Sequence, residues 1–259
     1  MVQLEKRNDI QIYVLNHKPV EYGLPDNSLY TPLQVGGYLE NLCKYRDNSG
    51  TNISSLNPLF AEWTGIYWIW KNSPSELKYV GQCQYRRRLE FAEDTDFDEI
   101  FKDYDVITCE PLSLGEVSVF GQYGACHCAE DIIIVRDCIQ ELYPDLVQPY
   151  DSFMKVGRFL FYSNGFIMKR EDYLRYCDFV FSIFQLYMKK KNWNSLDHIF
   201  SDIDKQIMAG QRSNHRGNIY QRQIFGFLSE RLLTFYLLQN YSFERIKRIK
   251  YHLMENTGI

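Results

Sequence analysis

The sequence lacks any long hydrophobic run. No segment reaches the ~18 consecutive apolar residues that mark a membrane-spanning helix. Residues 1–15 also contain no apolar stretch followed by a small-residue cleavage site, so no secretory signal is evident. We therefore expect a cytoplasmic protein.

The chain also lacks an excess of positive charge. Its 29 Lys and Arg residues are outnumbered by 33 Asp and Glu residues, which gives a formal net charge of −4. A general nucleic-acid binder needs a strong basic field that releases counterions from phosphates, so this class of function is disfavoured. Any basic site must be local.

Paired cysteine motifs are missing as well. The seven cysteines form an odd set without C-x-x-C spacing, which argues against a disulfide framework and a zinc ribbon. The cluster Cys126-His127-Cys128 alternates along a predicted helix, so its side chains point in different directions and tetrahedral zinc is not expected. We predict no metal site.

Aromatic residues are abundant, at 16% of the chain with 20 Tyr. Tyr combines an apolar face with a hydroxyl, which suits sugar rings and nucleobases, although a Tyr-rich core explains the same composition. With 259 residues, 45% of them hydrophobic, the chain can bury one substantial core. We predict a single domain, with an α/β core at 1–220 and C-terminal helices at 221–259.

Short apolar segments alternate with longer helical patterns. The acidic segment 90–103, with seven carboxylates, predicts a solvated loop or a short helix. This alternation predicts an α/β fold with a mainly parallel central sheet and helices on both faces. The expected strands are 9–15, 77–83, 104–109 and one or two within 158–169, and the expected helices are 58–72, 126–142 and 171–190.

The tail at 221–254 predicts two helices. The second, FERIKRIKYHLM, is amphipathic and could rest on anionic lipid, but a helix docked on the core with solvated lysines has the same pattern. Its basic residues are Arg245, Lys247, Arg248 and Lys250.

Three consecutive arginines follow a predicted strand. The segment YVGQC runs through Gln84 and Tyr85 into Arg86, Arg87 and Arg88. In open α/β sheets ligands bind beyond the carboxyl ends of the strands, and guanidinium groups match phosphate oxygens in charge and geometry. The pattern predicts a phosphate site, although these arginines could instead neutralise the acidic segment downstream.

Polar loops supply further candidates for ligand binding. His17 and Lys18 open the long loop after the first strand, and Asp47, Asn48 and Asn52 belong to the run DNSGTNIS ahead of an aromatic helix. Such loops offer backbone N–H groups and side-chain amides to ribose or phosphate, but helix capping explains much of the same composition.

Asn164 lies in the segment Ser-Asn-Gly between two apolar runs. The glycine at 165 permits a ligand to approach the backbone closely, and a plain hairpin turn is the competing interpretation.

Glu230 is our preferred catalytic carboxylate. Together with Arg231 it places charges in an otherwise apolar helix, where burial is costly unless the groups are paired or functional. His127 and Asp131 are four residues apart on a predicted helix, so we expect them to share a face, as a pocket-lining pair or as a structural one.

These segments together resemble the bacterial family catalogued as domain of unknown function 4422. The resemblance spans nearly the whole chain, and two departures stand out: Gln84 and Gly165 occupy positions where the family usually has His and Met. The matching pieces are His17-Lys18, YTPLQVG, DNSGTNIS with NPLFAEWTGIYWIWKN, YVGQCQYRRRL, the Gln122 to His127 to Asp131 spacing, SNGFIMKR and GFLSERLL.

Members of this family look like capsule and exopolysaccharide glycosyltransferases, some of them associated with galactofuranose transfer. The resemblance implies a GT-A-like fold, a UDP-sugar as substrate with no cofactor, and a lipid-linked oligosaccharide acceptor at the inner face of the membrane. In that fold an Asp-x-Asp usually holds a divalent cation, and arginines occupy its place here. We therefore expect inverting, metal-independent transfer.

In this mechanism Arg86 and Arg87 bind the diphosphate and Glu230 deprotonates the acceptor, with Asp131 next in line. The loops around His17 and residues 47–52 hold the nucleoside. Two other classes of function fit the same sequence: a catalytically silent glycan-binding or assembly subunit, and a hydrolase of nucleotide sugars.

Overall fold

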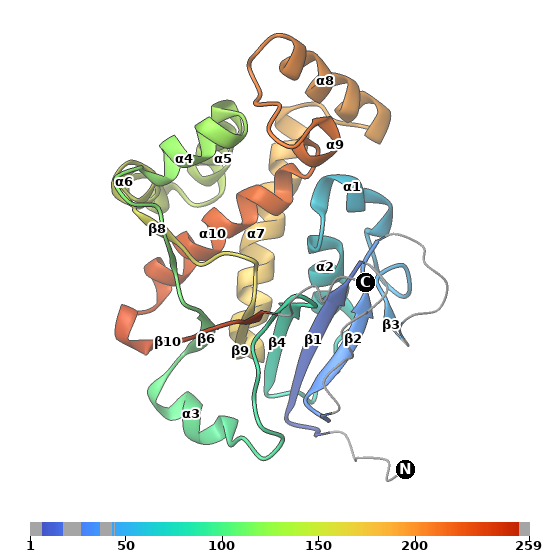
Figure 1. Ribbon diagram of the computed structural model, residues 1–259, viewed down its shortest axis with the longest axis vertical. Helices are drawn as coiled ribbons and strands as arrows, with labels where there is room; N and C mark the ends of the chain where they lie inside the picture. The colour runs from blue at the N-terminus through green and yellow to red at the C-terminus, as the bar shows by residue number, and fades with distance from the viewer. Residues whose placement is uncertain (1–6, 18–26, 37–42, 44, 254–259) are drawn as a thin grey trace.

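A twisted central sheet organises the protein. The computed structural model describes residues 7–17, 27–36, 43 and 45–253, and in this part of the chain the main sheet has nine strands (Figure 1). Seven of them follow the order β10-β6-β9-β4-β1-β2-β3, and β5 and β11 extend it beyond β4. The strands are β1 (Ile10–Asn16), β2 (Tyr30–Gln34), β3 (Tyr45–Arg46), β4 (Tyr79–Gln84), β5 (Arg87–Arg88), β6 (Val106–Cys109), β9 (Phe166–Lys169), β10 (Ile246–Ile249) and β11 (His252–Leu253), with β7 (Leu112–Ser113) and β8 (Phe159–Leu160) in a separate pair.

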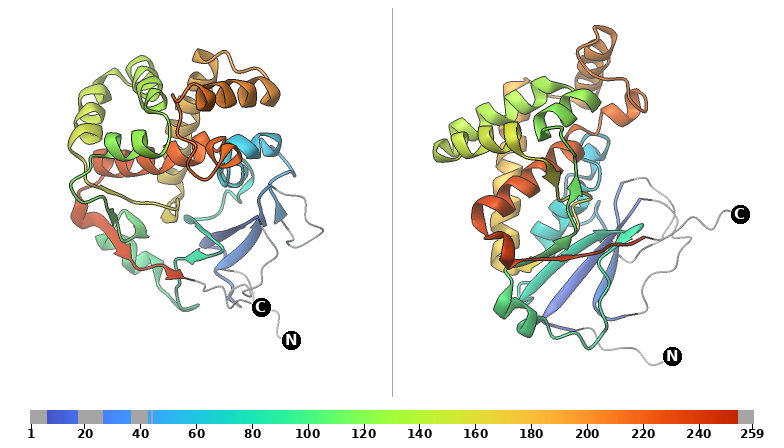
Figure 2. Two further views of the ribbon diagram at one scale, coloured as in Figure 1. Left: turned by 45° about the horizontal axis from the view of Figure 1, so that its top comes forward. Right: turned by 60° about the vertical axis from the view of Figure 1, so that its left-hand side comes forward.

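The helices gather mainly on one side of this sheet. Both views in Figure 2 place α4, α5 and α6 together beyond α10, away from β1 and β2. The helices are α1 (Asn57–Phe60), α2 (Trp63–Asn72), α3 (Phe97–Asp103), α4 (Val119–Cys126), α5 (Ala129–Leu142), α6 (Val147–Val156), α7 (Arg170–Lys190), α8 (Leu196–Met208), α9 (Asn218–Gln221) and α10 (Ile224–Asn240).

Along the seven-strand path, four of the six strand pairs are parallel, in line with the predicted mainly parallel sheet. β1 pairs in parallel with β2 on one side and with β4 on the other, and β10 pairs in parallel with β6. β9 is antiparallel to both β4 and β6. Because the chain adds β2 and β3 outward from β1 and then returns to the opposite side with β4, the strand order reverses between β1 and β4.

Alternating side chains along β1 supply two separate cores. Tyr13 and Leu15 point into the large core under the helical layer, whereas Ile10, Ile12 and Val14 belong to a smaller core on the other face. This period of two follows from the pleat of the strand. α2 and α7 cover the first face, α10 packs against α1 and α7, and α3 lies on the second face.

The helix expected at 58–72 is broken. α1 ends at Phe60, Ala61 adopts a left-handed conformation with φ of 50°, and α2 begins at Trp63. The side chain of Asn57 causes part of this, because its Nδ2 donates to the Ala61 carbonyl at 2.8 Å and to Thr64 Oγ1 at 3.0 Å. Such local side-chain bonds compete with the helical ladder.

A glycine brings α2 close to the sheet. A Cβ on Gly65 would lie 2.6 Å from Val35 Cγ2, so only glycine allows this approach. The break between α1 and α2 is therefore held directly beside the ends of β1 and β2.

The helix expected at 126–142 begins only at Ala129, and the prediction that His127 and Asp131 share a helical face is wrong. α4 ends at Cys126 and α5 begins at Ala129, with His127 between them at φ −137° and ψ −131°. The His127 ring stacks on that of Phe227, with centroids 4.0 Å apart. The Asp131 carboxylate instead accepts a hydrogen bond from the buried Arg212. The two side chains thus have different environments.

The last predicted helix is wrong as well. Residues 246–249 form β10, which extends the sheet beside β6, and the tail after α10 contains strands where 221–259 was expected to be helical. The β-branched Ile246 is 1% exposed in the core, and pairing covers an edge of β6 that would otherwise be open. The four basic residues therefore do not form one face of a helix.

None of the helices in the described part of the chain combines the length and apolarity needed to traverse a lipid bilayer.

Candidate functional site

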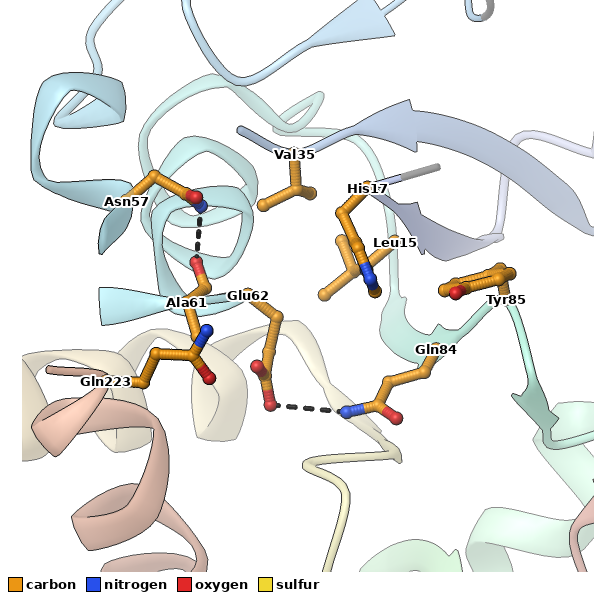
Figure 3. Close-up of a pocket in the computed structure, with 9 residues that line it drawn as sticks. All are labelled: Leu15, His17, Val35, Asn57, Ala61, Glu62, Gln84, Tyr85 and Gln223. Atoms are coloured by element: carbon orange, nitrogen blue, oxygen red, sulfur yellow. Dashed lines mark hydrogen bonds between the residues drawn. The ribbon is translucent and has the colours of Figure 1, made fainter. Parts of the chain in front are cut away.

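A cavity of about 210 Å³ opens at the carboxyl ends of the parallel strands. Leu15 lies in β1 and His17 directly after it, Val35 follows β2, and Gln84 is the last residue of β4, with Tyr85 next to it (Figure 3). The opposite wall comes from the helical layer and consists of Asn57, Ala61, Glu62 and Gln223.

The position of this cavity follows from the topology. It lies between the ends of β1 and β4, where the strand order reverses. The connections from such neighbouring strands leave in opposite directions, which opens a crevice that ligands commonly occupy. His17 and Gln84, both predicted to bind the donor, are brought together here, whereas Lys18 lies outside the described residues.

Glu62 contributes the carboxylate of the cavity wall. Its Oε1 accepts hydrogen bonds from Asn164 Nδ2 at 2.8 Å and from Gln84 Nε2 at 3.3 Å. Burial raises the pKa of this carboxyl group, and the nearby charge of Glu230 acts in the same direction. Among the described residues, Glu62 Oε2 has no hydrogen-bond partner.

The three arginines lie in a tight hairpin after β4. Arg88 is 3% exposed, and its Nε donates to the Tyr85 carbonyl at 3.2 Å, so this buried side chain stabilises the turn. Arg86 and Arg87 are half-buried, and their guanidinium groups lie over the rings of Tyr85 and Tyr162 at 5.3 and 5.6 Å.

The two outer arginines have no carboxylate partner among the described residues. Arg87 Nη1 donates to Gln84 Oε1 at 3.1 Å, and Arg86 Nε is buried without any hydrogen bond within the described chain. Their charge is therefore not used to neutralise the acidic segment downstream. Such guanidinium groups are suited to an external anion.

An aromatic contact joins the arginine turn to the cavity. The ring of His17 meets that of Tyr85 edge-on, with centroids 5.0 Å apart and planes at 82°. Because Arg86 lies over the same tyrosine, Tyr85 connects the cavity with the arginine turn.

Asn164 is placed behind the cavity by a strained turn. Ser163 and Asn164 both have positive φ, 68° and 49°, which is uncommon for residues other than glycine. Asn164 is 1% exposed, and its Nδ2 bonds to Glu62 and to Ser229 Oγ, so it reaches the cavity through Glu62.

Glu230 faces the same turn from α10. Its Oε1 accepts from the Ser163 backbone N–H at 3.0 Å, and its Oε2 pairs with Arg231 Nη1 at 3.1 Å. Arg231 is itself 3% exposed and donates to Gln122 and the Phe227 carbonyl. Both oxygens of Glu230 are thus engaged within the protein.

The loop before α1 lies outside the cavity wall. Asp47 is 3% exposed, and it accepts from Thr64 Oγ1 at 2.5 Å and from the Gly36 backbone N–H. Burial raises the pKa of its carboxyl group. Asn48 is exposed, and Asn52 forms a local turn by accepting from the Ser54 backbone N–H at 3.2 Å. These three residues do not join His17 and Gln84.

His127 and Asp131 are buried among the helices rather than at the cavity. Burial lowers the pKa of His127 to about 3, and its Nδ1 lies 3.2 Å from Gln221 Oε1. Asp131 is 1% exposed and receives two hydrogen bonds from Arg212, at 2.7 and 2.9 Å, and one from each of two tyrosine hydroxyls, Tyr123 and Tyr187. Its contacts are those of a structural ion pair.

Across the described residues, no three His, Cys, Asp or Glu side chains converge as potential metal ligands.

Sequence reasoning missed Glu62, Tyr85 and Gln223 as cavity residues. Glu62 carried a usable signal, because it is a lone charge in the apolar and aromatic run LFAEWTGIYW. Gln223, which precedes α10, had no comparable signal.

Comparisons with known proteins agree with this architecture. The family model described as Domain of unknown function (DUF4422) matches residues 11–201. A solved structure titled WbbM bifunctional glycosyltransferase, in its apo form, is similar with a TM-score of 0.74 and 23% sequence identity. The match covers 96% of this chain and 46% of that one, so this chain spans about half the length of the bifunctional protein. At this identity the likeness concerns the fold, and no curated protein matches the chain.

Proposed function

Because the chain belongs to the family described as Domain of unknown function (DUF4422), and because its cavity lies where an α/β sheet binds ligands, we propose that it is a glycosyltransferase. It transfers a sugar from a nucleotide-sugar donor to a glycan acceptor. The fold shared with a bifunctional glycosyltransferase supports this class.

The observation that carries the proposal is the position of the arginine turn beside the cavity, to which Tyr85 connects it. A cavity of about 210 Å³ is smaller than the ~300–1,000 Å³ of typical ligand pockets, so it can hold only part of a nucleotide sugar. The rest of the donor extends along Tyr85 toward Arg86 and Arg87. There the two guanidinium groups neutralise the diphosphate as it leaves.

Metal independence follows from this assignment. Charge that develops on a leaving diphosphate can be stabilised by arginine as well as by a divalent cation. Transfer proceeds by direct displacement with inversion, and the sugar is galactofuranose from UDP-galactofuranose. These finer statements rest on the family resemblance and on the charge of the turn.

The acceptor in this proposal is a lipid-linked oligosaccharide of a cell-surface polysaccharide, met at the inner face of the membrane. A membrane contact through a basic C-terminal helix is no longer expected, because Arg245, Lys247, Arg248 and Lys250 flank or belong to strand β10. Arg245 instead pairs with Asp105 at 2.5 Å.

A donor screen tests the proposal. Purified protein is incubated with UDP-galactofuranose, UDP-galactose and UDP-glucose and with a lipid-linked acceptor mimic, and products are identified by mass spectrometry with and without a chelator. We expect acceptor-dependent transfer that the chelator does not reduce. Binding without turnover would indicate an assembly subunit, and acceptor-independent donor loss would indicate a hydrolase.

Substitution of the outer arginines tests the diphosphate assignment. Arg86→Ala or Arg87→Ala should each lower kcat/KM roughly ten- to hundredfold, because a hydrogen bond to a charged group contributes about 1.5–3 kcal/mol. Lys250→Ala, on an exposed residue, is the control. Equal kcat/KM in all variants, or a strict need for manganese, would refute the arginine assignment.

A further inference from the structure

Two carboxylates flank the Ser163–Asn164 turn. Glu62 reaches it from the break between α1 and α2, and Glu230 reaches it from α10. Only the Glu62 side chain also lines the cavity, where it faces His17 and Gln84 (Figure 3). The two groups are therefore close but differ in their access to a substrate.

Both carboxylate oxygens of Glu230 are already bound within the protein. The Ser163 backbone N–H occupies one oxygen, and the cationic Arg231 occupies the other. Neither oxygen is therefore left open to an acceptor hydroxyl, and Glu230 is not among the residues that line the cavity. Its bond to Ser163 stabilises a turn that two left-handed residues would otherwise disfavour.

Glu62 has the opposite arrangement. Two neutral amides, from Asn164 and Gln84, hold a single oxygen, which fixes the plane of the carboxylate. The other oxygen has no partner among the described residues, so it is available to a hydroxyl that enters the cavity. Burial raises the pKa of this group, as in carboxylates that act as general bases near neutral pH.

Gln84 links this carboxylate to the arginine turn. Its amide nitrogen donates to Glu62 and its amide oxygen accepts from Arg87 Nη1. A single side chain thus sets the spacing between the free Glu62 oxygen and a guanidinium group. Displacement at a sugar carbon needs such a pair, with a base for the incoming hydroxyl and a cation for the departing phosphate.

We propose that Glu62, rather than Glu230, is the catalytic base, and that Glu230 is a positioning residue acting through the Ser163–Asn164 turn. This assignment rests on the glycosyltransferase function proposed above. Glu62 Oε2 takes the proton of the acceptor hydroxyl while the oxygen of this hydroxyl forms a bond to the anomeric carbon of the donor sugar. The bond from this carbon to the diphosphate oxygen breaks, and its electron pair leaves with the nucleoside diphosphate.

Paired isosteric substitutions test the assignment. Glu62→Gln keeps the shape of the side chain but removes the base, so kcat should fall on the order of 10²- to 10⁴-fold, while the thermal shift caused by UDP persists. Glu230→Gln should reduce kcat less, because an amide oxygen still accepts from Ser163. Glu76→Gln, on an exposed residue in the turn before β4, is the matched control.

The pH dependence separates a base from a structural residue. In the wild type and in Glu230→Gln, kcat should rise with pH through the raised pKa of Glu62, because only the ionised carboxylate accepts a proton. The Glu62→Gln variant should lose this rise, which forms the acidic limb of the pH profile of kcat. Glu62→Asp keeps an ionisable group and should retain the limb at lower kcat, which also guards against a folding defect in the Gln variant.

The possible outcomes can be distinguished. If the wild type transfers sugar and Glu62→Gln keeps near-normal kcat, or if Glu230→Gln alone loses the pH limb, the assignment of Glu62 is wrong and the proposed function stands. If the wild type transfers no sugar from any donor tested, the proposed function fails and this assignment fails with it.

Discussion

His127 shows how burial controls a single titratable group. The ring is 5% exposed, stacks on Phe227 and lies beside Gln221, and its pKa is lowered to about 3. The unfolded chain binds a proton here near its ordinary pKa of ~6.5, whereas the folded chain does not. Stability from this group is therefore complete above the unfolded pKa and is lost as pH falls toward the folded one.

We expect a measurable pH slope from this residue. Between pH 6 and pH 4 the free energy of unfolding of the wild type should fall more steeply than that of His127→Gln, by up to about 1.4 kcal/mol per pH unit. Urea unfolding at several pH values measures it. Carboxylates titrate alike in both chains, so identical slopes would contradict the buried neutral state of His127.

At the level of single residues, the sequence pointed to Glu230 as a site residue but not to Glu62. The same reasoning that singled out Glu230, a charge in an apolar helix, applies to Glu62, but an unbroken helix at 58–72 gave no reason to place Glu62 beside the strand ends. The left-handed Ala61 that turns it into the cavity depends on the Asn57 side chain. That contact cannot be read from helical periodicity.

The ion pair between Asp131 and Arg212 joins two elements. Asp131 lies in the first turn of α5, and Arg212 follows α8, so the pair ties the outer helix to the rest of the helical layer. The two side chains are 1% and 0% exposed. Removing one partner of such a buried pair leaves an uncompensated charge.

We expect Asp131→Asn to lower the free energy of unfolding by about 3–5 kcal/mol. Urea titration measures the loss, and adding Arg212→Met to the same chain should restore part of it by removing the unpaired charge. The folded variant should still bind UDP, because neither residue lines the cavity. A loss below 1 kcal/mol would show that solvent reaches the site.

Elements were predicted well where local pattern decides them. β1, β4, β6 and α7 lie close to the expected ranges, because alternating or continuous apolar residues fix them locally. The tail was predicted wrongly because β10 depends on β6, a partner about 140 residues earlier in the chain. A helical pattern of Phe243, Ile246 and Ile249 could not reveal that open edge.

At the scale of the whole molecule, the last strands close the structure. β10 covers the edge of β6, and β11 pairs with β5, which carries Arg87 and Arg88. The Tyr251 hydroxyl between them donates to the Tyr162 carbonyl at 3.0 Å. The far end of the described chain therefore supports the arginine turn.

The Ile246→Ala variant tests this support. The side chain is 1% exposed, so its truncation should cost about 2–4 kcal/mol and speed hydrogen exchange at residues 106–109. Lys250→Ala, on an exposed residue just after β10, is the control. Unchanged exchange in β6 would mean that β10 does not protect this edge.

The late position of β10 and β11 has a consequence for biosynthesis. These strands are synthesised after every other strand of the described sheet, so the edge of β6 that faces away from β9 stays open while α7 and α10 are already complete. An open strand edge invites pairing with other chains. We expect nascent or prematurely terminated chains to depend on chaperones until these last residues emerge.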